Sequence, residues 1–248
     1  MDIQNIIGKV NSINFSLDLS SSFGRFVVLV VALLILSFLI NFLLSHSVLG
    51  SRYRLFVGPG VILHEISHAL LCVVTGAKVH SISFFDKNGG KVQHGPSKIP
   101  LLGQILISMA PLVFGAVAIY FLSFRIGLKE IDLNQFTSSN SVIAFFRETI
   151  MSLDYRNALT ILSIYLVLSI GVTMTPSLQD IRNIAFSVIF IALVLYLLDR
   201  YNKFQIDYNQ LHISPEIISV LATVVFLLIL AFFLSMIIYI ISKIIKPT

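Results

Sequence analysis

The segment LFVGPGVILHEISHALLCVVTGA, from Leu55 to Ala77, is the most informative part of this chain. It is 23 residues long, and besides His64, Glu65 and His68 its only ionisable side chain is Cys72. A helix needs about 20 predominantly apolar residues to cross a bilayer. We therefore predict a membrane helix that carries two histidines and a glutamate inside an otherwise apolar span.

The spacing of these polar residues indicates a metal site. In a helix His64 and His68 lie one turn apart on one face, so both imidazoles can reach one ion. Glu65 is turned by about 100° from His64 and stands beside that ion, where a base for a water molecule is needed. The pattern is typical of zinc hydrolases, with the histidines as Zn2+ ligands and the glutamate as catalytic base. Cys72, four residues after His68, is interpreted as a small packing residue rather than a ligand.

Composition places the whole chain in a membrane. Hydrophobic residues make up 56% of the 248, charged residues 12%, and the mean hydropathy is +0.93. These values lie far outside the usual balance of a soluble domain. The formal charge of +5 comes from cations between apolar segments, with no basic run long enough for nucleic acid. We predict an integral, multi-pass membrane protein whose partners include the lipid bilayer and exclude nucleic acid.

Six segments are long and apolar enough to span the bilayer: Phe26 to Leu44, Leu55 to Ala77, Ile99 to Phe124, Asn157 to Thr175, about Ile181 to Leu198, and Ile217 to Ser242. The predicted fold is an all-α membrane protein, a polytopic six-helix transmembrane bundle. Residues 1–54 would form an N-terminal segment and the first span, residues 55–198 a catalytic membrane core, and residues 199–248 a loop and the last span. The distribution of Lys and Arg does not decide the orientation.

A small β-hairpin at residues 78–94 is predicted between the second and third spans, with strands at Lys78 to Phe85 and Lys91 to His94 and a turn at residues 86–90. Its unpaired backbone groups could bind an extended peptide by strand addition, or it could simply connect two helices. His80 and His94 are interpreted as ordinary loop histidines. The longest connection, Arg125 to Arg156, is predicted to hold a helix along the membrane interface, with a lid over the site as the alternative.

A catalytic zinc site normally has three protein ligands and leaves the fourth position to water. Among the acidic residues other than Glu65, only Asp180 interrupts near-continuous apolar sequence, after Pro176 breaks the helix. In the six-span topology the fourth helix ends on the side toward which His68 points, so we predict Asp180 as the third ligand. The alternative is an N-cap for the fifth helix, and one carboxylate could serve both roles.

These residues resemble the site-2 protease family of intramembrane zinc metalloproteases, and the likeness covers roughly Leu55 to Leu198. Its motifs are Gly58-Pro59-Gly60 running into His64-Glu65-Ile66-Ser67-His68-Ala69-Leu70, the Thr75-Gly76-Ala77 exit, the glycine-containing hairpin and the Pro-containing segment that ends in Asp180. The resemblance implies a core of the second, third and fourth spans, with zinc on His64, His68 and Asp180 and with Glu65 as general base. It also implies hydrolysis of peptide bonds within transmembrane segments of protein or peptide substrates.

The aspartate motif departs from the family pattern. That pattern is usually of the Asn-Pro and Asp-Gly type, whereas this chain has Thr175 before Pro176 and Ile181 after Asp180. The proline and the aspartate are retained, so the ligand is retained as well. A role for the missing asparagine in holding substrate is in doubt, and Asn183 is the candidate substitute.

Three other functions agree with parts of the sequence. A membrane zinc protease of the CAAX-processing type would take a glutamate as third ligand, which here would be Glu148. A catalytically inactive zinc-binding membrane scaffold is suggested by the altered aspartate motif. A zinc transporter is less favoured because the remaining spans offer no second cluster of acidic and histidine residues. The sequence leaves the substrate and the oligomeric state open.

Overall fold

The computed structural model describes residues 21–47, 53–86, 89–128, 131–136, 138–177, 179–187, 190 and 212–245. Within these ranges the chain is mostly helical, with one two-stranded antiparallel sheet. The longer helices are α2 (Ser22–Ser45), α4 (Gly58–Val74), α5 (Leu102–Arg125), α6 (Ser139–Ser152), α7 (Ala158–Thr173) and α9 (Pro215–Ile245). This confirms the predicted helical class. Most of the second half of the predicted fifth span, and residues 87–88 of the predicted turn, lie outside the described residues.

Within the part of the chain that the structure describes, three helices, α2, α5 and α9, are long and apolar enough to cross a membrane. At about 1.5 Å per residue, the 24 residues of α2 extend for about 36 Å, which exceeds the roughly 30 Å hydrocarbon core of a bilayer. Helices α4 and α7 are apolar but contain only 17 and 16 residues. The length and composition of these three helices therefore support a membrane protein. The predicted count of six spans is not confirmed.

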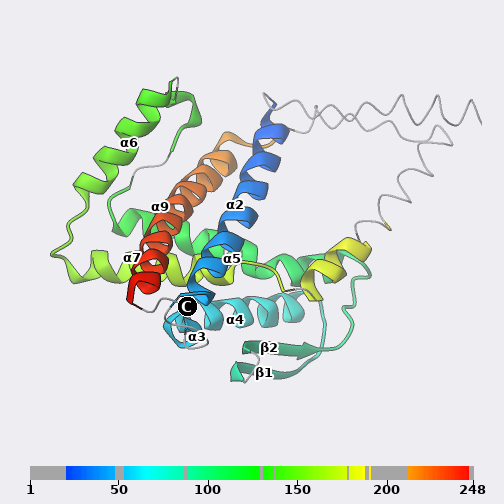
Figure 1. Cartoon of the computed structure of the whole chain (residues 1–248). Coiled ribbons are helices and arrows are strands. Elements are labelled where there is room, and N and C mark those ends of the chain that lie inside the picture. The colour runs from blue at the N-terminus through cyan, green and yellow to red at the C-terminus, as the bar shows by residue number, and fades with distance from the viewer. Residues whose placement is uncertain are drawn as a thin grey trace, which may run out of the picture.

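Helices α2 and α9 lie side by side and run in the same direction (Figure 1). The start of α2 is tied to the segment just before α9, because the backbone N–H of Ile213 donates to Ser22 Oγ at 3.1 Å. In a chain of six consecutive crossings the first and last spans run in opposite directions. The parallel pair is thus not the arrangement that the six-span prediction requires, and it fits an odd number of crossings.

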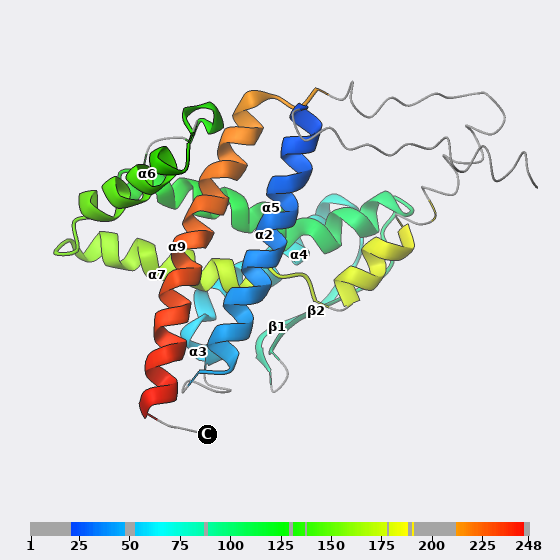
Figure 2. The same cartoon turned by 45° about the horizontal axis from the view of Figure 1, so that its top comes forward.

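Helices α4, α5 and α7 pack together and cross the α2 and α9 pair (Figure 2). Small residues allow the close approach, as is common between membrane helices. Gly60 of α4 lies against the backbone of Ser169 on α7, and its N–H donates to Ser169 Oγ at 2.9 Å. Gly171 of α7 lies against Leu228 of α9. These glycines bring α4 and α9 against opposite sides of α7.

Replacing Gly60 with alanine is expected to destabilise the protein, because the added Cβ would collide with the Ser169 carbonyl, a backbone group that cannot rotate away. Such overpacking costs about 1–3 kcal/mol. Gly58→Ala is the matched control on the same helix, since its Cβ would meet only the Phe85 ring at 3.4 Å. Thermal unfolding of purified protein should show a lower midpoint for Gly60→Ala alone. Equal midpoints for the two variants would contradict the close packing.

The predicted hairpin is confirmed as strands β1 (Val79–Asp86) and β2 (Gly89–His94). They pair antiparallel, with Ile82 opposite Val92. The turn into the hairpin follows Thr75, where Gly76 adopts a φ of +72° that favours glycine and ends α4. The hairpin therefore folds back along α4, the helix that carries His64 and His68 (Figure 1).

Helix α6 confirms the helix predicted between Arg125 and Arg156. The rings of Phe145 and Phe146 pack on Phe226 of α9, with centroid distances of 4.9 and 4.5 Å. Figure 1 shows α6 on the far side of α9 from the hairpin. The alternative of a lid over the histidines is therefore wrong, because the aromatic face of α6 is already used to pack on α9.

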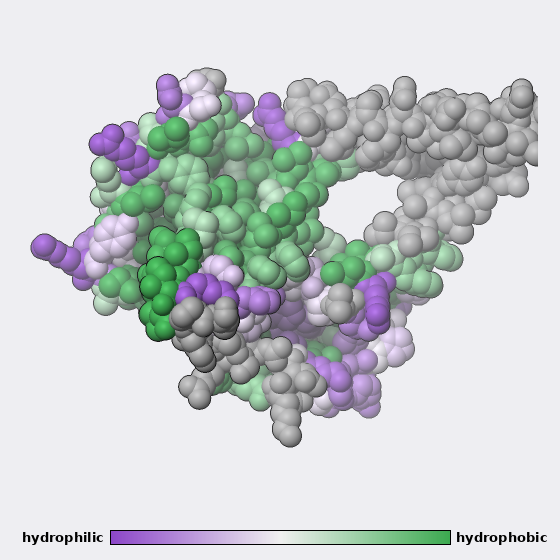
Figure 3. Space-filling model, in the orientation of Figure 1, coloured by the Kyte–Doolittle hydropathy of each residue, from purple (hydrophilic) through white to green (hydrophobic). Residues whose placement is uncertain are grey.

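The surface of the bundle is strongly apolar. Figure 3 shows hydrophobic side chains over the face formed by α2 and α9, with hydrophilic residues near the hairpin and along the outer edge on the α6 side. Large exposed hydrophobic side chains on the three long helices include Val28, Val31, Ile35, Phe38, Phe42, Val113, Val117, Phe121, Phe124, Phe233, Ile237, Ile240 and Ile241. Such a surface is stable against lipid and unfavourable in water.

Candidate metal centre

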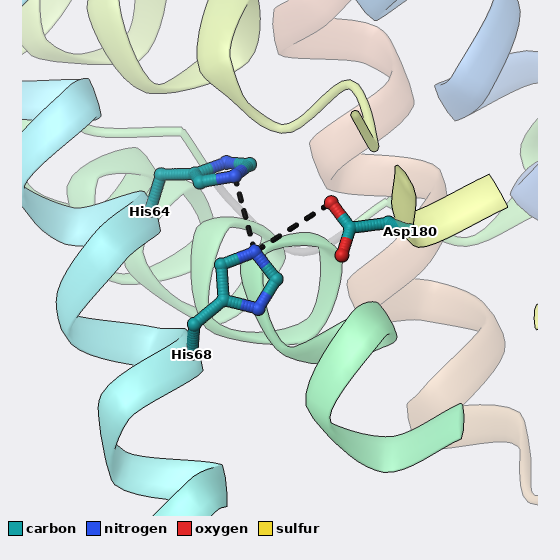
Figure 4. A group of neighbouring side chains, drawn as sticks. All are labelled: His64, His68 and Asp180. Carbon is teal, nitrogen blue, oxygen red and sulfur yellow. Dashed lines mark hydrogen bonds and ion pairs between the residues drawn. The ribbon is translucent and has the colours of Figure 1, made fainter. Parts of the chain in front are cut away.

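The two histidines of the HExxH pattern lie on α4, which begins after Val57 with Pro59 in its first turn. Helical spacing brings the rings of His64 and His68 together, with centroids 4.8 Å apart. Their Nε2 atoms are 3.2 Å apart (Figure 4). The sequence prediction that both imidazoles face one point is confirmed.

Asp180 approaches the same point from a different part of the chain. It lies near the start of the helical segment 179–187, and its Oδ2 is 3.6 Å from His68 Nε2 (Figure 4). The ligand atoms of His64, His68 and Asp180 all lie within 4.8 Å of one another. His68 and Asp180 are buried, each with 8% exposure. The predicted set of three residues is thus brought together, and it could hold a metal ion.

Backbone carbonyls hold both imidazoles in a ligand orientation. His64 Nδ1 lies 2.6 Å from the Thr173 carbonyl, and His68 Nδ1 lies 2.8 Å from the Ile107 carbonyl. Because a carbonyl oxygen only accepts, each Nδ1 carries the hydrogen and each neutral ring keeps a lone pair on Nε2. Metal-binding histidines are usually held in this way through the other ring nitrogen.

Both carbonyls are available because the expected helical donors are missing. In α5 the N–H that would bond to the Ile107 carbonyl belongs to position 111, which is Pro111 and has no N–H. Thr173 ends α7, and the N–H four residues ahead, on Ser177, donates to Asp180 instead. The role of Pro111 was not predicted, although a proline in the middle of an apolar helix is visible in the sequence.

Ser177 orients the aspartate. Its N–H and Oγ both donate to Asp180 Oδ2, at 3.0 and 2.6 Å, and the Asp180 N–H donates back to Ser177 Oγ at 3.1 Å. This is a capping box, in which Ser177 is the N-cap and Asp180 its third residue. The alternative of Asp180 as the N-cap itself is therefore corrected. The Ser-x-x-Asp spacing was the signal for it, and the same carboxylate closes the box and faces His68.

Glu65 is buried beside the histidines, with 5% exposure. Together with His64 it lines a cavity of about 180 Å³. Its carboxylate lies directly over Gly90 of the hairpin, where any Cβ would collide with it. Glu65 thus stands next to the ligand group without belonging to it, and its role as base stays a prediction.

The other candidate ligands lie elsewhere. Glu148 is exposed on α6, in a surface groove with Asn140 and Arg147, and does not approach the two histidines. Cys72 is fully buried against Ala77 and Ile107, which confirms the packing interpretation. Within the described ranges His80 and His94 are also outside the group.

Asn183, the candidate substitute for the missing asparagine, is directed toward α5. Its Nδ2 donates to Ser108 Oγ at 3.5 Å, and its Oδ1 accepts from Gln179 at 2.9 Å. It is not among the residues that line the cavity beside Glu65. The structure therefore does not place Asn183 at the cavity, where a residue that replaces the family's asparagine in holding substrate would be needed.

Comparisons with protein-family models, curated proteins and solved structures gave no match for this chain.

Proposed function

We propose that this protein is a multi-pass intramembrane zinc metalloendopeptidase, similar to the site-2 protease family, that hydrolyses peptide bonds within transmembrane segments of membrane proteins. The observation that carries the proposal is the convergence of His64, His68 and Asp180 inside an apolar helical bundle, with Glu65 beside them. Ionisable residues inside a membrane are costly and are usually functional.

The geometry of the donor atoms fits zinc. With Zn–N distances of about 2.0–2.1 Å, two ligands of a tetrahedral site lie about 3.3–3.4 Å apart. The Nε2 atoms of His64 and His68 are 3.2 Å apart, and His68 Nε2 lies 3.6 Å from Asp180 Oδ2. The facing lone pairs of two neutral imidazoles are satisfied by a cation between them. When bound, zinc polarises a carbonyl and makes water acidic enough to lose a proton near neutral pH.

The residues of the chain supply the proton transfers and the orientation. Glu65 accepts a proton from the attacking water and then delivers it to the nitrogen of the departing amine, so that one peptide bond and one water give a carboxyl and an amino terminus. The carbonyls of Ile107 and Thr173 keep the two imidazoles in place throughout. The apolar helices around Glu65 and the two histidines keep bulk water away from these polar side chains.

The hairpin supports a role in presenting the substrate. A helical transmembrane segment hides its carbonyls in hydrogen bonds, so it must unwind locally before it can be cut. The hairpin lies along α4 with Gly90 against Glu65, so a peptide paired to its edge would run past the base. Alternatively, the hairpin only connects two helices. In that case, substitutions along the edge of the hairpin should not affect cleavage.

The proposal is tested with purified protein in liposomes and a panel of single-span substrates that carry helix-weakening residues. We expect about one zinc per chain, new termini inside the transmembrane segment by mass spectrometry, and loss of cleavage on chelation with recovery on zinc addition. A folded, zinc-loaded protein that leaves every substrate intact would instead favour the scaffold. A folded protein that binds no zinc would overturn the metal centre.

Replacing Pro111 with alanine is expected to weaken zinc binding about 10- to 100-fold, the usual effect of losing an outer-shell partner. The new N–H would compete with His68 Nδ1 for the Ile107 carbonyl. The metal-free protein should be at least as thermally stable as the parent, because a proline inside a helix costs about 3 kcal/mol. Zinc competition with a chromogenic chelator and thermal unfolding measure the two effects.

The matched control is Pro215→Ala, at the first residue of α9, where a proline is well tolerated. It should leave zinc affinity unchanged. Unchanged affinity in Pro111→Ala as well would show that the freed carbonyl does not position His68.

A further inference from the structure

Helix α2 carries two polar side chains within its otherwise apolar stretch after Arg25 and before Ser45, namely Ser37 and Asn41. They are one helical turn apart and share a face. Ser37 is fully buried, donates to the Gly171 carbonyl and lies 2.8 Å from Thr175 Oγ1. An amide in such a helix is unfavourable unless its polar atoms find partners. The presence of Asn41 in this apolar stretch therefore needs a physical explanation.

The Ser37 contact fixes α2 against the segment that leads to Asp180. Thr175 precedes Pro176 in that segment, and its Oγ1 is in hydrogen-bonding contact with Ser37. Asn41, one turn further along α2, is thereby held at a defined position relative to the metal-binding residues. Its place beside the site is a consequence of tertiary packing and not of any motif.

Tyr53 orients the Asn41 amide. The Tyr53 hydroxyl donates to Asn41 Oδ1 at 3.0 Å. With its oxygen engaged, the amide presents Nδ2 with two N–H groups. Among the described residues no acceptor bonds to that nitrogen. The pair thus offers a hydrogen-bond donor that is held in place and not used within the described part of the fold.

Both residues line the cavity beside Glu65. The lining of this cavity of about 180 Å³ combines apolar side chains of α4 and α7 with a few polar groups, including Asn41, Tyr53, His64, Glu65, Thr175 and Ser177. A peptide unit carries one C=O acceptor and one N–H donor, and both must be satisfied away from water. An amide donor and a carboxylate acceptor on the walls of one cavity match these two requirements.

We infer that Asn41, oriented by Tyr53, forms a substrate subsite that donates a hydrogen bond to a backbone carbonyl of the extended peptide in the cavity beside Glu65. This inference rests on the proposed function. Asn41 binds the unwound segment in the ground state and in the transition state alike, so it contributes to affinity rather than to the proton transfers. The ligand class is peptide backbone, which suits substrates of varied side-chain sequence.

The test uses Asn41→Leu, a change of similar shape without the donor. The KM for a single-span substrate should rise about tenfold with little change in kcat, because a carbonyl of the bound peptide is left unsatisfied. In a Glu65→Gln background, the affinity for uncut substrate measured by fluorescence should fall by about the same factor. Zinc content should stay at the parent value.

Asn183→Leu and Asn140→Leu are matched controls, since neither residue lines the cavity, and both should keep the parent KM. Tyr53→Phe leaves the amide in place but removes its anchor, so a smaller rise in KM is expected. If Asn41→Leu loses zinc through misfolding, Tyr53→Phe supplies the test.

The subsite would be overturned if zinc-loaded Asn41→Leu kept the parent KM and the parent affinity for substrate. The same holds for Tyr53→Phe where that variant supplies the test. A fall in kcat with KM unchanged would also overturn the subsite, because that pattern is not ground-state binding. Neither result would affect the proposed protease function. A wild-type protein that binds zinc but cuts no substrate would overturn that function instead, and the two failures are therefore distinguishable.

Discussion

Glu65→Gln should lose cleavage almost completely while it keeps its zinc. General acid and base catalysis contributes about 10²–10⁴-fold to a rate, and an amide cannot accept the proton of the attacking water. The kcat should therefore fall at least about 100-fold. Glutamine has nearly the same shape as glutamate, so the packing over Gly90 and the positions of His64 and His68 should be preserved.

The measurements are the turnover of a single-span substrate and the zinc content of the same preparation by elemental analysis. Glu148→Gln is the matched control, because Glu148 is exposed on α6 and does not line the cavity. It should keep full activity. Cleavage by Glu65→Gln at the parent rate would remove the assigned base, and loss of zinc would place Glu65 among the ligands.

Asp180→Ala should lose most of its zinc and all of its activity. The aspartate supplies one of three ligands, so the loss of affinity should exceed the 10- to 100-fold expected for an outer-shell residue. The substitution also breaks the capping box with Ser177, and losing a helix cap costs about 1 kcal/mol. Ser177→Ala removes the hydroxyl but keeps the carboxylate, so it should retain more zinc than Asp180→Ala.

Zinc content and a zinc titration of the folded variants provide the measurement. Glu148→Ala serves as the control and should bind zinc normally. The opposite pattern, with zinc kept in Asp180→Ala and lost in Glu148→Ala, would favour the CAAX-processing type of protease. That outcome would also require α6 to move from its packing on Phe226 toward the histidines.

The candidate site was predictable to different extents. The shared face of His64 and His68 follows from helical spacing within one apolar segment, and the structure confirms it. Asp180 was predicted by its isolation in apolar sequence and by family resemblance, and the structure brings it to His68. Ser177 was missed because its role is a reciprocal hydrogen bond, although the local spacing contained that information.

The roles of Pro111 and Asn41 could not be predicted from local sequence patterns. The absence of a backbone N–H at Pro111 matters only because His68 of another helix lies next to the freed carbonyl. Asn41 matters only because α2 packs on the segment before Asp180 and places its amide in the cavity. Each effect depends on two segments that are far apart in sequence.

The apolar helices, the hairpin and the facing pair of histidines follow from the sequence alone, because helical and strand periodicities are local properties of the chain. Tertiary packing is needed to bring Asp180 to those histidines, to hold the imidazoles with carbonyls, and to make α2 and α9 parallel. Packing between distant segments depends on shape and on hydrogen-bond partners, which one-dimensional patterns do not specify.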